Sequence, residues 1–192
     1  AQQRLTANDF QPEVLQLFDR YVHGDLSRRG FLDQATRIAG TPAAAAALLA
    51  ALSPQFAAAQ VVKPNDPRIA TQRQAFDSPQ GNGHVVGLLA VPAKASARLP
   101  MVLVVHENRG LNPHIEDITR RLAVDGFLAY APDALAPTGG YPGDEDKARE
   151  AFGKLDPAKA RADFVAAAQG LLKLPEGNGK LGVVGFCYGG GI

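Results

Sequence analysis

The chain has 192 residues, enough for one domain of ordinary size with a leader segment in front of it. Its hydrophobic share of 46% and charged share of 20% are those of a globular protein, and a formal net charge of +1 creates no field that would gather nucleic acid. One cysteine excludes an internal disulfide, and nothing in the composition indicates a metal or haem cluster. We therefore expect no metal, no organic cofactor and no nucleic-acid partner.

Residues 1–26 predict a helical extension at the N-terminus. Between Phe10 and His23 the apolar residues recur with the spacing of one helix face. We interpret this segment as a short amphipathic helix whose purpose the sequence does not reveal.

Residues 27–60 contain the three parts of an export signal. Ser27 to Leu32 read Ser-Arg-Arg-Gly-Phe-Leu, an Ala/Leu-rich stretch follows from about Ile38 to Leu52, and Ala57-Ala58-Ala59 would place cleavage before Gln60. The segment resembles a twin-arginine signal, which implies a periplasmic or secreted protein. Its apolar run is shorter than the ~20 residues of a membrane-spanning helix, so we expect no permanent membrane anchor. The alternative is an amphipathic helix that packs on the domain and leaves the arginine pair in solvent.

Residues 61–192 predict a domain in which strands and helices alternate. After a linker at residues 63–67, four apolar runs have the length of strands: His84–Val91, Met101–Val105, Phe127–Ala131 and Leu181–Gly185. We expect one helix from Asn112-Pro113 to Asp125-Gly126, and further helix on both sides of a break at Asp156-Pro157. Strands that alternate with helices indicate a parallel sheet covered on both faces.

The last apolar run leads into Gly185-Phe186-Cys187-Tyr188-Gly189, in which glycines flank a nucleophile at a spacing of two. Glycines are needed there because a sharp strand-to-helix turn brings backbone segments close together. A helix that begins just past the turn would direct its N-terminal dipole at the sulfur and favour the thiolate. We therefore predict that Cys187 is a nucleophile and that the N–H of Tyr188 is one donor of an oxyanion hole. The alternative is a buried structural cysteine.

The loop His106–Gly110 follows the second predicted strand. In this architecture that loop holds the second oxyanion donor, for which the N–H of Asn108 is the candidate. We expect Glu107 to pair with the thiol or to take its proton, and burial there would raise its pKa. The alternative is a surface salt bridge from Glu107 to Arg109 or Arg120. The histidine that opens the loop is interpreted as a structural residue that closes the strand.

These segments resemble the dienelactone hydrolase family, α/β-hydrolases that use a cysteine where most relatives use serine. The resemblance extends from about Pro64 to the last residue and rests on His106–Asn112, Gly126–Asp133 and Gly179–Gly190. It implies hydrolysis of a small-molecule ester or lactone through a thioacyl-enzyme, without a cofactor. In the family the glutamate after the early strand helps to activate the cysteine, and the backbone amides after these two residues form the oxyanion hole. The resemblance thus implies these roles for Glu107, Asn108 and Tyr188.

The sequence departs from the family at three places. Asn108 and Arg109 stand where the best-known members have an aliphatic and an aromatic residue, which predicts a more polar pocket wall. Residues 134–137 read Ala-Leu-Ala-Pro where those members carry an arginine for the substrate carboxylate, so dienelactone is not the expected substrate. The family's aspartate and histidine lie downstream of the cysteine, whereas this sequence ends five residues after Cys187.

We therefore expect an α/β-hydrolase-type, mostly parallel sheet with helices on both faces that is incomplete at its C-terminal side. A C-terminal segment or a second chain would have to complete the domain. Hydrolysis is the leading hypothesis for the function. The main alternative is a non-catalytic hydrolase fragment or interaction subunit, and a redox-sensing thiol is a weaker one because no second cysteine is present.

Overall fold

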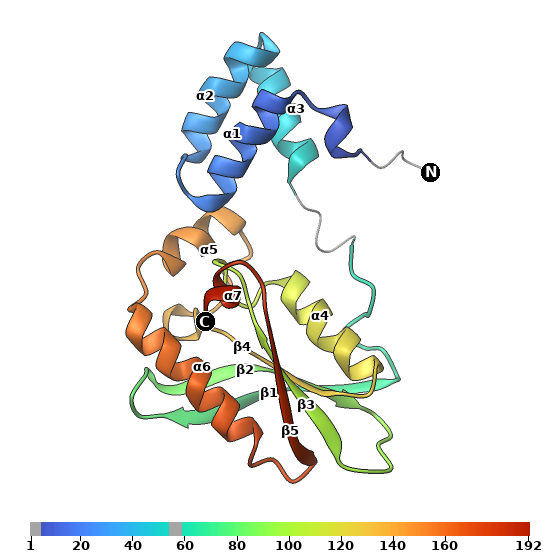
Figure 1. Ribbon diagram of the computed structural model, residues 1–192. Coiled ribbons are helices and arrows are strands. Elements are labelled where there is room, and N and C mark those ends of the chain that lie inside the picture. The colour runs from blue at the N-terminus through green and yellow to red at the C-terminus, as the bar shows by residue number, and fades with distance from the viewer. Residues whose placement is uncertain (1–4, 54–58) are drawn as a thin grey trace. The chain divides into compact units, whose positions relative to one another are not determined.

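The computed structural model describes residues 5–53 and 59–192 of the chain (Figure 1). The chain divides into two compact units, Ala1–Gln55 and Phe56–Ile192. The predicted cleavage motif includes Ala57 and Ala58, which lie outside the described residues.

The first unit consists of a short 3-10 helix, η1 (Ala7–Asp9), and three α-helices, α1 (Pro12–His23), α2 (Arg28–Ala39) and α3 (Pro42–Leu52). The side chains of Ser27 and Thr41 cap the N-termini of α2 and α3, and Gly24 ends α1 in a left-handed conformation. Helix α1 confirms the predicted amphipathic helix. The three helices share one apolar core, formed by Leu17, Tyr21, Phe31, Ala35, Ala45 and Leu49.

Helices α2 and α3 cover most of the segment predicted to be an export signal. Arg28 and Arg29 are exposed, whereas Phe31 is completely buried in the core of the unit. No described helix is by itself long and apolar enough to cross a membrane; α2 and α3 reach that length and apolarity only together, with a bend of 115° between them. The twin-arginine signal stays a prediction.

The second unit contains a five-stranded sheet in the order β1-β2-β4-β3-β5. Strand β2 runs antiparallel to both β1 and β4, and β3 runs parallel to both β4 and β5, so that β2 alone opposes the other described strands. The mostly parallel sheet of the prediction is confirmed, but alternation of strands and helices did not foresee the antiparallel β1–β2 hairpin. The strands are β1 (Ile69–Ser78), β2 (Gly83–Pro92), β3 (Leu99–Val105), β4 (Leu128–Pro132) and β5 (Gly177–Gly185).

Helices α4 and α6 lie on opposite faces of this sheet (Figure 1). Alternate residues of β3 show the division, because Leu103 and Val105 pack on the face of α6 while Val104 packs on the face of α4. The predicted helix start at Asn112-Pro113 and the break at Asp156-Pro157 are confirmed. The helices of the unit are α4 (Pro113–Val124), η2 (Ala136–Thr138), α5 (Glu145–Phe152), α6 (Pro157–Leu171) and α7 (Tyr188–Gly191).

Strand β1 is the element that the sequence pattern missed. It contains the polar run Thr71–Gln74 and is exposed over most of its length, because it lies at the edge of the sheet. Its strand conformation is fixed by pairing with β2 from Ile69↔Pro92 to Ser78↔Gly83. Backbone pairing of this kind leaves no apolar alternation in the sequence.

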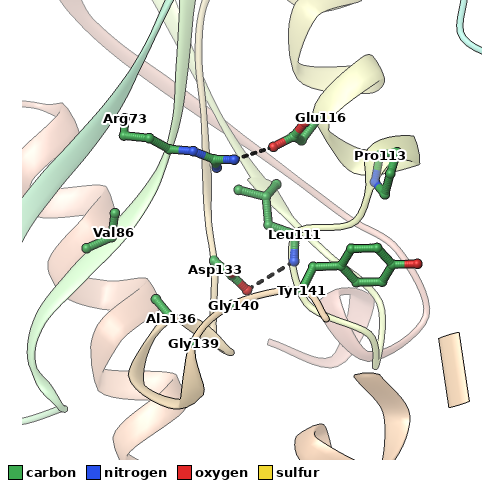
Figure 2. A pocket seen from close by; sticks show the side chains of 10 residues that line it. All are labelled: Arg73, Val86, Leu111, Pro113, Glu116, Asp133, Ala136, Gly139, Gly140 and Tyr141. Carbon is green, nitrogen blue, oxygen red and sulfur yellow. Dashed lines mark hydrogen bonds and ion pairs between the residues drawn. The ribbon is translucent and has the colours of Figure 1, made fainter. Parts of the chain in front are cut away.

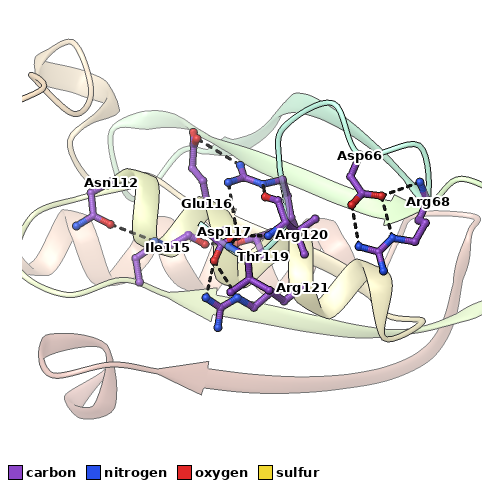
Figure 3. A network of polar contacts seen from close by, with 11 residues as sticks. Asp66, Arg68, Asn112, Ile115, Glu116, Asp117, Thr119, Arg120 and Arg121 are labelled. Carbon is purple, nitrogen blue, oxygen red and sulfur yellow. Dashed lines mark hydrogen bonds and ion pairs between the residues drawn. The ribbon is translucent and has the colours of Figure 1, made fainter. Parts of the chain in front are cut away.

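A buried ionic network holds the beginning of this unit against α4 (Figure 3). Asp117, which is 1% exposed, accepts hydrogen bonds from the N–H groups of Val61 (3.1 Å) and Val62 (2.8 Å). The Nε of Arg120 donates to the carbonyl oxygen of Val62 at 2.8 Å. Burial raises the pKa of Asp117, but the bonds from Val62, Val61 and Arg121 outweigh burial and leave the pKa below its usual value.

Candidate active site

Cys187 lies in the turn between β5 and α7, where it is the N-cap residue of α7. Its φ of 50° makes it the one non-glycine residue with a positive φ among residues 5–53 and 59–192. The side chain is exposed. Cys187 is therefore not the buried structural cysteine of the alternative interpretation; it is held in a backbone conformation that L-residues adopt at a cost.

The two glycines that flank the turn are required by the backbone around it. A Cβ atom on Gly185 would lie closer than 3.0 Å to the backbone of Gly189, and a Cβ atom on Gly189 would lie closer than 3.0 Å to the carbonyl group of Val105. Neither neighbour is the end of a flexible side chain. The steric need for glycine that the sequence predicted is thus present at both positions.

The turn and the loop after β3 leave the sheet side by side. Val105 pairs with Gly185 in the parallel β3–β5 ladder, and the N–H of Phe186 donates to the carbonyl oxygen of Val105 at 3.1 Å. Glu107 and Cys187 each come two residues after this pair. In the described part of the chain no hydrogen bond or ion pair joins these two side chains, so their pairing stays a prediction.

The alternative partners proposed for Glu107 are engaged with other carboxylates. Arg109 forms an ion pair with Glu145 at 2.9 Å, and Arg120 lies 3.7 Å from Glu116 and 3.9 Å from Asp117. Among the described ion pairs Glu107 takes part in none. No described ion pair therefore supports the alternative interpretation of Glu107 as half of a surface salt bridge to Arg109 or Arg120.

Both predicted oxyanion donors carry an unused N–H group. Within residues 59–192 the backbone N–H of Asn108 and that of Tyr188 donate no hydrogen bond to another residue. Tyr188 is the first residue of α7, and the N–H groups of a first helical turn have no partner inside the helix. Two backbone donors are thus available at neighbouring strand ends.

His106, the residue directly after β3, is completely buried and uses both ring nitrogens. The N–H of Ala134 donates to its Nε2 at 3.1 Å, which requires that Nε2 carries no hydrogen. Nδ1 then carries it and donates to the carbonyl oxygen of Glu107 at 2.5 Å. Burial lowers the pKa of His106. The structure agrees with its interpretation as a structural histidine, because a neutral ring bonded at both nitrogens has none left for acid–base work.

Asn108 and Arg109, which were predicted to form a polar pocket wall, bind to each other, and the Arg109 side chain is nearly buried. The Arg109 side chain is 10% exposed and binds both Glu145 and the side-chain oxygen of Asn108. The hydroxyl of Tyr141 donates to the other oxygen of Glu145 at 2.6 Å. Burial raises the pKa of Glu145 against the opposing effects of Tyr141 and Arg109. Sequence reasoning missed Glu145 and Tyr141, although Glu145 lies in the first turn of a helix that it had predicted.

Asp133, directly after β4, was also missed as a structural anchor. Its Oδ1 accepts hydrogen bonds from the N–H of Leu111 at 3.1 Å and from the N–H of Leu135 at 3.0 Å. The carboxylate therefore ties the loop after β4 to the loop after β3. The only signal in the sequence was the Pro-Asp dipeptide at the end of a strand.

A cavity of about 520 Å³ lies among β1, β2, the first turn of α4 and the loop after β4. Figure 2 shows the side chains that line it. The Arg73–Glu116 ion pair, 2.6 Å long, and the Asp133 carboxylate face it. Neither Cys187 nor Glu107 lines it, and the carboxylates of Asp133 and Glu116 in its wall are engaged with backbone N–H groups and with Arg73, so we assign the chemistry to the turn at Cys187. Its walls are Arg73, Val86, Leu111, Pro113, Glu116, Asp133, Ala136, Gly139, Gly140 and Tyr141.

Comparison with known proteins gives two family matches in different parts of the chain. The family described as "Dienelactone hydrolase family" matches residues 85–192, more than half of the chain, and the family described as "YqhI-like" matches residues 2–40. The two structural units divide within the stretch between the two matched regions.

Several known proteins and solved structures are similar to part of this chain. The "Putative hydrolase fragment YghX" of Escherichia coli is 50% identical over 113 residues, which are 59% of this chain and 97% of that protein. A "Putative carboxymethylenebutenolidase" of Synechocystis is 36% identical over 59% of this chain and 49% of its own length. The crystal structure of a putative dienelactone hydrolase from Klebsiella pneumoniae superimposes with a TM-score of 0.51 at 30% identity, covering 63% of this chain and 52% of that one. This chain spans about half the length of the latter two relatives.

Proposed function

Because this chain belongs to the dienelactone hydrolase family, we propose that it supplies the nucleophile and the oxyanion hole for hydrolysis of an ester or lactone. The Cys187 thiolate attacks the carbonyl carbon and forms a C–S bond, and the tetrahedral intermediate collapses as the C–O bond breaks and the alcohol leaves. Water then attacks the thioacyl-enzyme, releases the carboxylic acid and returns the thiol. A substrate of small-molecule size is implied by the carboxymethylenebutenolidase names of the relatives.

The observation that carries the proposal is the backbone of Cys187. A cysteine at φ 50°, exposed and flanked by two glycines that no larger residue can replace, has the geometry of a nucleophile held at a sharp strand-to-helix turn. A conformation of this kind costs ~1–3 kcal/mol and is retained where it serves a function.

The acid–base groups are divided between this chain and polypeptide outside it. Glu107 helps to form the thiolate, since it follows β3 at the point where the neighbouring strand β5 leads into the turn of Cys187. The N–H groups of Asn108 and Tyr188 stabilise the oxyanion. We propose that the histidine and aspartate come from a C-terminal segment or a second chain, because the match covers about half of the carboxymethylenebutenolidase relative and both ring nitrogens of His106 are already bonded.

The proposal is tested by hydrolysis of p-nitrophenyl acetate with the protein isolated as its cell makes it. Cys187→Ala should reduce turnover by at least about a thousandfold, and Cys187→Ser should also be strongly impaired, because each removes the thiolate. Mass spectrometry of acid-quenched wild-type protein should find the acyl group on the peptide that contains Cys187. Turnover that survives loss of the sulfur would exclude Cys187 as the nucleophile.

The alternative, a non-catalytic fragment or interaction subunit, is favoured by one observation. The Escherichia coli relative named a putative hydrolase fragment consists almost entirely of the region that it shares with this chain. The same experiment separates the two functions: a natively isolated protein that neither hydrolyses esters nor acquires an acyl group supports the subunit.

We also propose that the protein is exported by the twin-arginine route. The exposed Arg28 and Arg29 at the start of α2, followed by the apolar α3, support this location. N-terminal sequencing of periplasmic and cytoplasmic protein tests it, with Arg28→Lys/Arg29→Lys as the variant and Arg37→Lys as the control. An intact leader on periplasmic protein would contradict the cleavable signal.

A further inference from the structure

His106 fixes the orientation of a peptide group that belongs to the proposed site. Its Nδ1–H donates to the carbonyl oxygen of Glu107, and this carbonyl shares one planar peptide unit with the N–H of Asn108. The peptide is trans, so the N–H points opposite to the carbonyl. Holding the carbonyl toward the buried ring therefore turns the unused N–H of Asn108 away from it.

The same ring supports the second oxyanion donor through aromatic contacts. His106 packs edge-on against Phe152 and Phe164, with ring centroids 6.0 and 5.5 Å apart. Tyr188 packs against both phenylalanines, at 4.8 and 6.4 Å. These four side chains form one cluster beneath the two strand ends. The residue whose N–H is the second donor is therefore linked, through these two phenylalanines, to the ring that orients the first donor.

The bond from Ala134 completes the restraint. The N–H of Ala134 donates to Nε2, so the ring cannot rotate without losing one bond or the other. This bond also selects the tautomer in which Nδ1 is the donor. The loop after β4 thus sets the hydrogen position on which the Glu107 carbonyl depends.

We infer that His106 is a positioning residue for the oxyanion hole, which orients the Asn108 N–H through the Glu107 peptide and supports Tyr188 through the aromatic cluster. This inference rests on the proposed hydrolase function. His106 touches no reacting atom in this role. It acts before the reaction, by fixing donors that have no partner until the carbonyl oxygen gains negative charge.

Two amide variants separate the two ring bonds. In His106→Gln the amide oxygen can replace Nε2 as acceptor for Ala134, but the donor to Glu107 is lost. In His106→Asn the amide nitrogen can replace Nδ1 as donor to Glu107, but the acceptor for Ala134 is lost. We expect kcat for p-nitrophenyl acetate to fall about 10- to 100-fold in the Gln variant, with KM changed less than about twofold, because the oxyanion forms after binding. The Asn variant also loses the ring and the acceptor for Ala134, but it keeps the donor to Glu107, so its kcat should fall several-fold less than that of the Gln variant.

Two further measurements distinguish positioning from general damage. A trifluoromethyl ketone, which forms a tetrahedral oxyanion with a thiolate, should lose affinity for the Gln variant in proportion to kcat/KM. The rate at which iodoacetamide alkylates Cys187 should be equal in all three proteins, because that displacement develops no oxyanion.

The outcomes separate this inference from the proposed function. A wild-type protein that hydrolyses no ester overturns both. An active wild type whose Gln variant has an unchanged kcat leaves the hydrolase intact and overturns the positioning role. Nitrogen-15 NMR of the ring gives a test without substrate, since an Nε2–H tautomer would overturn the inference whatever the activity.

Discussion

Two loops leave the same edge of the sheet, and they are held in opposite ways. The loop after β3 is held by side chains that bond to it from several directions: His106, Asp133 and the Arg109–Glu145 pair. The turn after β5 is held by close backbone packing. Gly185 and Gly189 have no side chain, which lets the backbone of the turn approach itself and β3. The comparison teaches that a backbone N–H donor can be oriented in two ways. Several hydrogen bonds can orient it, and the loss of one bond is then tolerated; close backbone packing can also orient it, and a single added methyl group then disrupts it.

The largest effect is expected where close packing is broken. Gly189→Ala should lower the free energy of unfolding by about 3 kcal/mol or more, because the added Cβ meets the rigid backbone of Val105. Gly191→Ala is the matched control, since nothing lies within 4 Å of its Cβ, and it should change stability by less than about 1 kcal/mol. Urea unfolding measures both. Equal effects would mean that the turn is not held by close approach.

The next effect is expected in the loop held by bonds. Asp133→Ala should cost about 2 kcal/mol or more, because the buried N–H groups of Leu111 and Leu135 lose their acceptor. Asp77→Ala, an exposed carboxylate on β1, should change stability by less than about 0.5 kcal/mol. The urea midpoints of the two variants give the comparison. An Asp133→Ala protein as stable as Asp77→Ala would show that this anchor does not hold the loop.

The bonded loop should also respond to pH. Burial lowers the pKa of His106 below its ordinary 6.5, against the charges of Asp133 and Glu107 that face it, so below that pH the unfolded chain binds more protons than the folded one. Stability should therefore fall as the pH falls below 6.5, by at most about 1.4 kcal/mol per unit from this group. His106→Gln should remove that share of the slope in urea titrations between about pH 7.5 and pH 5.5. A variant with the wild-type slope would assign the acid sensitivity to other groups.

The smallest effect is expected at the ion pair beside the loop. Glu145→Gln should cost only about 1 kcal/mol, because Arg109 keeps its bond to Asn108 and the Glu145 side chain is 29% exposed. Glu150→Gln, in the exposed pair with Lys154, should produce no measurable change. Thermal melts of both variants at low salt measure the difference. A cost for Glu145→Gln as large as that of Gly189→Ala would contradict the idea that the bonded loop tolerates partial loss.

The sequence predicted those parts of the site that depend on local geometry. Gly185 and Gly189 stand at a fixed spacing from Cys187 because the turn itself requires them, so five residues of sequence suffice to locate it. The helix starts at Asn112-Pro113 and Asp156-Pro157 could be predicted for the same reason, since a cap and a proline act within one turn.

The contacts that the sequence did not reveal join residues far apart in the chain. Asp133 binds a backbone group 22 residues away, and Ala134 binds a ring 28 residues away. A carboxylate bound by backbone N–H groups leaves no pattern in its partners, because every residue except proline carries that group. Strand β1 escaped prediction for the same reason, since its partner is the backbone of β2.

The network at Asp117 and Arg120 has a mechanical consequence. Any tension that arrives along the chain from upstream of Gln60 reaches this unit at Val61 and Val62, where three hydrogen bonds transfer it to the side of α4. The three bonds lie before β1 in the chain and do not involve the strand pairs of the sheet. They therefore give residues 61 and 62 an attachment to α4 that is separate from the β1–β2 ladder.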